Sequence, residues 1–163
     1  MNSKLFHLVY KSNASEDMPL EKIQEIVRVS QKNNAAIRVT GMLMYIEGNF
    51  LQVLEGEQEI VENLYHKIVK DSRHLGIKKI LGGPIDKRSF PKWSMGMKIY
   101  TCEDHEDLKK INNDYDFDLY KELTANKSIL LEMMRYFYTN ENLDFKYFWT
   151  EKSDPEFKLI QEE

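Results

Sequence analysis

Two apolar segments in the middle of the chain are separated by only three residues, and this pair constrains the fold more than any other feature. Residues 38–46 (RVTGMLMYI) and 50–56 (FLQVLEG) contain β-branched and aromatic side chains, and residues 47–49 (EGN) are typical turn residues. Short apolar runs that flank a glycine-containing turn predict two paired β-strands. A β-hairpin is therefore the first element that the sequence predicts.

One polar residue interrupts the second strand of this hairpin. Phe50, Leu51, Val53 and Leu54 form a nearly continuous apolar run, and Gln52 stands in the middle of it. A glutamine at this position either faces water on a strand covered on one side, or lies inside and must find hydrogen-bond partners for its amide. The residues alone leave both alternatives open.

The elements around the hairpin predict the fold class. Apolar residues at helical spacing follow Pro19, which suits the first turn of a helix. We expect helices over 19–33 and about 58–72, and further strands over 4–10, 77–85 and 93–101. The order β-α-β-β-α-β-β is that of an α+β protein, a ferredoxin-like sheet with an extra strand. Both helices should cover one face of the sheet, so that a ligand would enter between helices and sheet.

The last third of the chain differs in composition. After Thr101 the sequence becomes charged and polar, and apolar residues at helical spacing return near 104–123 and 127–139. We therefore expect one domain over residues 1–101, followed by a C-terminal helical extension over 102–163 with two helices. Met133, Met134 and Phe137 in the second helix are candidates for a contact surface.

Composition excludes several classes of protein. The net charge is −4, which does not favour a protein that binds duplex DNA directly. No apolar run approaches the roughly 20 residues that span a bilayer. The single cysteine, Cys102, fits a reducing compartment, and we expect a cytoplasmic protein. No metal site is expected, because Cys102 and the histidines lack ligand spacing; the histidines are His7, His66, His74 and His105.

Four polar residues could meet between the sheet and the helices. Tyr10 ends the first predicted strand, Asn33 and Asn34 end the first helix, and Gln52 lies on the third strand. Together they would offer neutral donors and acceptors that suit a planar heterocycle, with no obvious general base. The alternative is that Tyr10 is an ordinary core residue, Gln52 faces solvent and the asparagines cap the helix. The residues 69–74 (VKDSRH) likewise suit either a basic helix end or an anion site.

Several motifs resemble those of one family. The segments TGMLMY, GNFLQVLEGE, VKDSRH and PIDKRSFPKWSMG occur in an order and spacing similar to the BLUF domain family, over Lys4 to about Lys98. Members of that family are blue-light sensors that bind a flavin, usually FAD. The resemblance implies that Tyr10 is the electron and proton donor. It also implies that Gln52 bridges Tyr10 and the flavin, and therefore faces inward.

The resemblance implies binding roles for further residues. Asn34 matches the asparagine that holds the N3–H and C4 carbonyl of the flavin ring, and Asn33 the residue near its C2 carbonyl. Ile26 matches an aliphatic residue packed against the ring. Lys67 stands where a basic side chain approaches the ring and ribityl chain, and Asp71, one turn later, is its expected partner.

The match also covers the phosphate region and the output segment. Arg73 and His74 match an arginine and a histidine near the phosphates. Trp93 and Met95 match the segment tied to signal output, and we expect them to share one face of the last strand. These matches predict a sensor without enzymatic activity.

The implied sensor binds FAD, with FMN or riboflavin as alternatives. Its output would be a change in a homo-oligomer or in the binding of a downstream protein. Two other classes stay open: a ferredoxin-like flavoenzyme or acyl-phosphate hydrolase, and a small-molecule-binding adaptor without photochemistry.

Overall fold

The protein is an α+β domain, seen in a computed structural model that describes residues 4–92, 94–100, 127, 131 and 132. Its elements follow the predicted order of strands and helices. They are β1 (Leu5–Ala14), α1 (Leu20–Ala36), β2 (Thr40–Ile46), β3 (Asn49–Glu57), α2 (Gln58–Val69), β4 (His74–Pro84) and β5 (Gly96–Tyr100).

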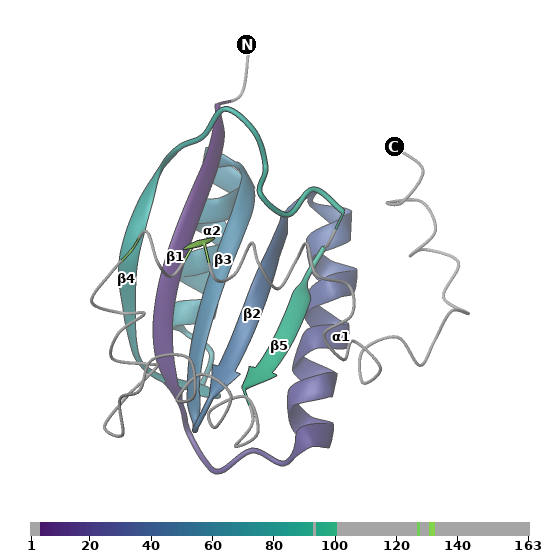
Figure 1. Cartoon of the computed structure of the whole chain (residues 1–163), viewed down its shortest axis with the longest axis vertical. Helices are drawn as coiled ribbons and strands as arrows, with labels where there is room; N and C mark the ends of the chain where they lie inside the picture. The colour runs from purple at the N-terminus through teal and green to yellow at the C-terminus, as the bar shows by residue number, and fades with distance from the viewer. Residues whose placement is uncertain (1–3, 93, 101–126, 128–130, 133–163) are drawn as a thin grey trace, which may run out of the picture.

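The strands form one mixed sheet in the order β4-β1-β3-β2-β5, which places β3 at the centre (Figure 1). β3 is antiparallel to both β1 and β2, and β2 is parallel to β5. The hairpin of β2 and β3 closes at Glu47 and Gly48, both of which have positive φ angles (46° and 82°). Glycine adopts such angles without steric cost, so Gly48 fits the tight turn that the sequence predicts.

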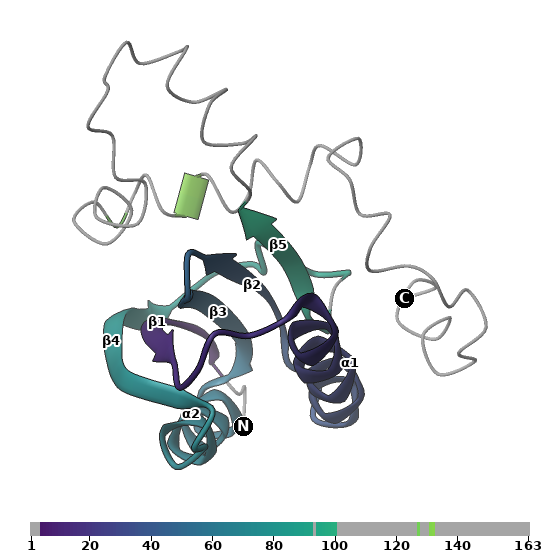
Figure 2. The ribbon, with the colours of Figure 1, turned by 90° about the horizontal axis from the view of Figure 1, so that it is seen from below.

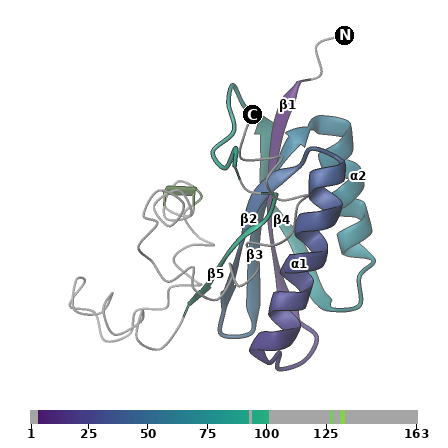
Figure 3. The ribbon, with the colours of Figure 1, turned by 90° about the vertical axis from the view of Figure 1, so that its right-hand side faces the viewer.

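Both described long helices lie on the same face of the sheet, as predicted (Figures 2 and 3). α1 begins after Pro19 and turns Ile23, Ile26 and Val27 toward the sheet, a spacing that places all three on one side of a helix. α2 buries Val61 in the same way. The hydrophobic core between sheet and helices is therefore the layer into which Gln52 and Tyr10 project.

The opposite face of the sheet is apolar as well. Val9, Met42, Met44, Leu51 and Val53 alternate with the helix-facing residues along their strands, and all five are fully buried. Residues 131 and 132 are helical and lie on this side of the sheet (Figure 3). Most of the two predicted C-terminal helices, with the boundary at 101 and the residues Met133, Met134 and Phe137, lies outside the described residues.

One strand boundary and one helix boundary differ from the sequence prediction for a physical reason. β1 was expected to end at Tyr10 but continues to Ala14, because Ser12 and Asn13 pair with Phe50 and Asn49 of β3. The polar residues after Tyr10 are thus part of the strand and not a turn. α2 ends at Val69 and not near Ser72, so the residues that follow form a turn into β4.

The last strand begins later than predicted. β5 starts at Gly96, the first residue paired with β2, whereas the sequence placed its start at Trp93. Ser94 and Met95 precede the strand, and their carbonyls accept hydrogen bonds from α1. Met95 therefore lies before the strand in which the sequence placed it. Trp93 lies outside the described residues, so a shared face for Trp93 and Met95 stays a prediction.

No helix in the described part of the chain is both long enough and apolar enough to cross a membrane. Among the same residues, no group of three or more histidine, cysteine, aspartate or glutamate side chains is arranged to hold a metal ion.

Candidate functional site

Tyr10 and Gln52 form a buried pair at the centre of the sheet. They lie opposite each other on β1 and β3, and the Tyr10 hydroxyl donates a hydrogen bond to Gln52 Oε1. Tyr10 is 0% exposed and Gln52 is 5% exposed. Gln52 therefore lies inside, with the hydrogen-bond partner that a buried amide requires.

The other end of the Gln52 amide has a weaker partner. Gln52 Nε2 donates to Met95 Sδ over 3.2 Å, and a thioether sulfur is a weak acceptor. The amide is therefore held firmly through its oxygen by Tyr10 and loosely through its nitrogen by Met95. A stronger acceptor that reached this nitrogen would compete successfully with the sulfur.

The end of α1 supplies two further amides. Asn34 is 3% exposed, and its Nδ2 donates to the Ser94 carbonyl over 2.9 Å. Gln31, one turn earlier, donates from Nε2 to the Met95 carbonyl over 2.9 Å. The side chain of Asn34 thus points toward the segment before β5, while its main-chain carbonyl accepts the N–H of Val39 after the helix. Asn33 is exposed.

Burial controls the protonation of Tyr10. It raises the pKa of the hydroxyl far above its ordinary value, and the nearby Asp71 and Tyr65 raise it further. The Tyr65 ring lies 5.5 Å from the Tyr10 ring, centroid to centroid. At neutral pH the phenol therefore keeps its proton, which it shares with Gln52.

His74 lies close to the same pair. Its Nδ1 is 2.7 Å from Ser12 Oγ on β1, and its ring centroid is 4.9 Å from that of Phe50 and 6.3 Å from that of Tyr10. Burial lowers the pKa of the imidazole, so this histidine favours its neutral form.

The expected pairing of Lys67 with Asp71 is wrong. Asp71 accepts hydrogen bonds from the main-chain N–H of Arg73 over 3.0 Å and from Arg73 Nε over 2.9 Å. These bonds lower the pKa of the Asp71 carboxyl to about 2. The reason is that α2 ends at Val69, so Asp71 lies in a turn and no longer on the helix face of Lys67. Lys67 and Arg73 are both exposed.

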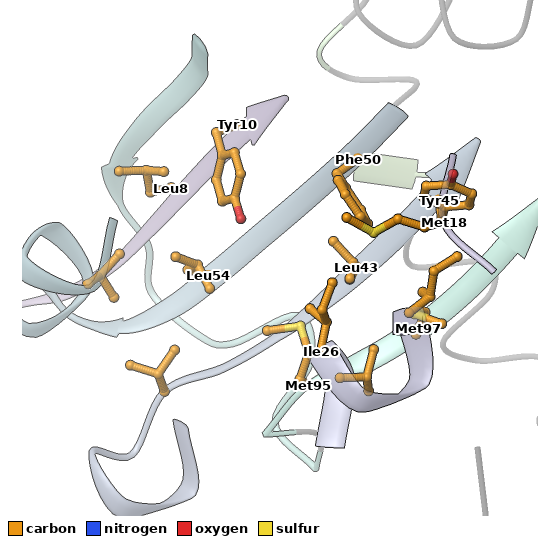
Figure 4. Packing of buried hydrophobic residues seen from close by; sticks show 14 of the residues in the cluster. Leu8, Tyr10, Met18, Ile26, Leu43, Tyr45, Phe50, Leu54, Met95 and Met97 are labelled. Atoms are coloured by element: carbon orange, nitrogen blue, oxygen red, sulfur yellow. The ribbon is translucent and has the colours of Figure 1, made fainter. Parts of the chain in front are cut away.

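The structure therefore separates the predicted residues into two groups. Tyr10, Gln52, Asn34, Ile26 and Met95 are buried together in the layer between sheet and α1. Figure 4 shows the side chains of Tyr10, Ile26 and Met95 in this layer. The exposed or partly exposed group consists of Asn33, Lys67, Asp71, Arg73 and His74.

A second polar cluster, which sequence reasoning missed, fixes the loop between β4 and β5. Glu55 is 1% exposed, and its carboxylate accepts the main-chain N–H groups of Ser89 and Phe90 over 2.9 and 3.0 Å. Burial raises the pKa of this carboxyl, although the two N–H groups and Arg88 oppose the change. The signal for it in the sequence was a charged residue at the end of the buried run FLQVLEG.

Arg88 completes this cluster from the loop itself. It donates to Thr40 Oγ1, to the Glu55 carbonyl and to the Arg38 carbonyl, each over 2.7 Å. Gln31 was also missed. Its position three residues before Asn34, on the same side of a helix, was the signal that could have found it.

The residues present fit a flavin ring. An isoalloxazine edge carries an imide N–H and carbonyl oxygens, which neutral amides can bind without a change of charge. Gln52 Nε2 has only a thioether as its acceptor. Ser94 Oγ, within the described part of the chain, is buried without a hydrogen-bond partner, and a buried polar group of this kind calls for one. Asn34 lies beside Ser94 and brings a second amide.

Comparison with known proteins defines the family. The model of the BLUF family, sensors of blue light using FAD, matches residues 5–96. The chain belongs to this family, and it is a flavin-binding blue-light sensor domain that uses FAD.

Curated relatives match over the same region. The blue light- and temperature-regulated antirepressor BluF of Escherichia coli is 35% identical over 99 residues, 61% of this chain and 24% of the antirepressor. The photoactivated adenylate cyclase subunit beta of Euglena longa is 36% identical over 95 residues, 58% of this chain and 11% of the cyclase subunit. The chain thus spans about a quarter or less of these two proteins.

Two solved structures are similar over most of their length. The dark-state structure of BlrB, a BLUF protein, has a TM-score of 0.66 and 26% identity, covering 84% of this chain and 99% of BlrB. The photo-activated state of BlsA has a TM-score of 0.65 and 27% identity, covering 80% of this chain and 94% of BlsA. These likenesses support the ferredoxin-like fold.

Proposed function

We propose that this domain senses blue light through electron and proton loss from Tyr10, followed by rearrangement of the Gln52 amide. The observation that carries the proposal is the hydrogen bond from the buried Tyr10 hydroxyl to Gln52 Oε1. A bound flavin, once excited, supplies the oxidant.

The burial of Tyr10 couples its proton to its electron. Because burial raises the pKa of the phenol, the proton stays on Tyr10 for as long as the ring keeps its electron. Loss of an electron makes the phenol strongly acidic, and Gln52 Oε1 is the acceptor at the hydroxyl. When the electron and the proton return to Tyr10, the amide of Gln52 can settle in a rearranged state.

The weak contact of Gln52 Nε2 with the Met95 sulfur makes rearrangement inexpensive. Turning the amide gives up a bond to a thioether, which is a poor acceptor compared with a carbonyl oxygen. Met95 is flexible and tolerates repacking, so it can follow the amide. Met95 would then pass the change toward β5 and α1.

Binding of the cofactor falls to the buried residues of α1 and their exposed neighbours. Asn34 would hold the imide edge of the ring, and Ile26 would pack against its plane. Lys67, Arg73 and His74, with Asn33 and Asp71, would serve the ribityl chain, the phosphates and the rim of the ring. Because the ring-binding residues are the buried ones, FMN or riboflavin would also load in vitro.

The output we propose is a change in binding, not catalysis. A hydrogen bond contributes a net 0.5–1.5 kcal/mol or so, which shifts an equilibrium by about tenfold at most. Such a change acts best on an interface already near balance, such as a homo-oligomer or a contact with a downstream protein. Of the relatives named above, one is named an antirepressor and the other a photoactivated adenylate cyclase subunit. A cytoplasmic location would suit such a partner.

The visible spectrum of the purified protein, in the dark and under blue light, tests this function. We expect flavin bands with a reversible small red shift. Tyr10→Phe should retain flavin and lose the shift completely, since only the transferable proton is removed. Tyr45→Phe, on β2 outside the site, is the matched control and should shift like the parent.

Three results would overturn the proposal. A colourless protein would indicate an adaptor without photochemistry. Bleaching by a reducing substrate without a red shift would indicate a flavoenzyme. A normal photocycle in Tyr10→Phe would remove the role of Tyr10.

A further inference from the structure

α1 holds the segment before β5 through two side-chain amides one turn apart. Gln31 and Asn34 lie on the same side of the helix. They donate to the consecutive carbonyls of Met95 and Ser94, each over 2.9 Å. The helix therefore binds the main chain of this segment at two adjacent points.

These carbonyls belong to residues that the sheet does not position. Pairing between β2 and β5 begins where Met42 lies opposite Gly96, immediately after Met95. The main chain at Met95 is thus fixed by α1. The Met95 side chain nevertheless reaches across the layer to place its sulfur 3.2 Å from Gln52 Nε2.

The two amides of α1 have different surroundings. Asn34 is 3% exposed and lies in the proposed flavin site, so its bonds must serve the ring as well as Ser94. Gln31 is partly exposed and carries no assigned role toward the cofactor. Gln31 can therefore keep the Met95 carbonyl in place even when the hydrogen bonds of Asn34 change.

We propose that Gln31 is a positioning residue, whose hydrogen bond to the Met95 carbonyl keeps the Met95 sulfur against the Gln52 amide and links this amide to α1. The inference rests on the proposed function, because the amide matters only if it switches. It adds α1 as a route of output that runs beside β5. It also makes Gln31 a determinant of how quickly the dark arrangement returns, since Met95 must dock again against Gln52.

Substitution of the donor tests the inference on the flavin-loaded full chain. Gln31→Glu keeps the shape of the side chain, but a carboxylate cannot donate. Gln31→Ala removes the same donor without adding charge. Lys32→Ala, at the neighbouring exposed position, is the matched control. Protein labelled at the methionine methyl groups with ¹³C reports on Met95 by NMR, and the Met95→Leu spectrum assigns its signal.

We expect both Gln31 variants to retain flavin and the red shift. In the dark, the Met95 methyl signal should move or broaden in both of them and stay unchanged in Lys32→Ala. Return from the red-shifted state should slow by roughly two- to tenfold, the range that one hydrogen bond gives. A role in flavin binding would instead show as loss of flavin, and that outcome would overturn the inference.

Other outcomes are equally decisive. A Met95 signal and a recovery rate in both Gln31 variants equal to those of Lys32→Ala would overturn the positioning role. An effect in Gln31→Glu without one in Gln31→Ala would assign the change to charge, and overturn it too. Absence of a red shift in the parent itself would overturn the proposed function, while the dark NMR comparison would still decide whether Gln31 positions Met95.

Discussion

Gln52 and Glu55 are three residues apart on the same central strand, and they differ in how firmly they are held. Both are nearly inaccessible, at 5% and 1% exposure. Gln52 faces the helices, and Glu55, by the alternation of a strand, faces the other side. The comparison shows that one strand can carry two buried polar side chains whose hydrogen-bond partners differ in strength.

The difference lies in the partners of each group. Glu55 accepts two main-chain N–H groups from one loop, and bonds to a charged acceptor are the stronger kind. The Gln52 amide has one good partner, Tyr10, and one poor partner, the Met95 sulfur. A neutral amide can exchange its two ends at low cost, whereas a buried carboxylate that left its donors would be unpaired.

Replacing Gln52 and Glu55 one at a time gives the sharpest test of this difference. Gln52→Leu should bind flavin and lose the red shift entirely, because no amide remains to rearrange. Glu55→Gln should keep the full shift, because this side chain lies on the other face of the sheet. Difference spectra after blue light measure both. A shift in Gln52→Leu, or its loss in Glu55→Gln, would reverse the roles that we assign to the two residues.

Asn34 should give the next largest effect. Asn34→Ala leaves the imide edge of the ring without its partner in a buried site, at a cost of about 1–3 kcal/mol. We expect flavin to bind roughly 5- to 150-fold more weakly, measured by the release of flavin on dilution. Asn33→Ala, at the exposed neighbour, should have a much smaller effect. Equal losses in the two variants would contradict the placement of Asn34 as the buried ligand.

Glu55 should control stability and its dependence on pH. Glu55→Ala leaves the N–H groups of Ser89 and Phe90 without acceptors and should lower the free energy of unfolding by about 1–3 kcal/mol. Because burial raises the pKa of Glu55, the folded protein binds a proton there more readily than the unfolded chain does. The stability that protonated Glu55 contributes is fully present below the pKa of this group in the unfolded chain. It is lost as the pH rises through the higher pKa of Glu55 in the folded protein.

Urea unfolding between about pH 4 and about pH 8 measures this dependence. The stability of the parent relative to Glu55→Gln, which has no titrating group at this position, should be greatest in acid and decline with rising pH. If the stability difference between the parent and Glu55→Gln grew with pH instead, the hydrogen bonds to the Glu55 carboxylate would stabilise its charged form more than burial destabilises it.

Sequence reasoning predicted the fold through local patterns that survive in the structure. The hairpin, the two amphipathic helices and the order of the elements along the chain depend on spacing and turn residues within short windows. The inward orientation of Gln52 was different, because apolar neighbours on both sides gave no alternation to follow. The resemblance to a family decided it, and the register that pairs Gln52 with Tyr10 agrees.

The contacts that sequence reasoning did not predict depend on where helices end and strands begin. The partner of Asp71 was predicted on the assumption that α2 continues, but Val69 ends the helix and Arg73 becomes the neighbour. Met95 was placed in a strand, although α1 binds its carbonyl before pairing begins. Contacts between residues about 60 positions apart, such as Gln31 and Met95, leave no periodic trace in one sequence.

The loop anchored by Glu55 has a consequence for protein engineering. Glu55 holds the loop by its main-chain N–H groups, and Arg88 grips the main-chain carbonyls of Arg38 and Glu55. Within the loop, these hydrogen bonds depend on the path of the main chain and on the Arg88 side chain only. Asp86 and Lys87, exposed at the start of the loop, therefore form a natural attachment point. A fluorophore or peptide tag attached there would leave these hydrogen bonds unchanged.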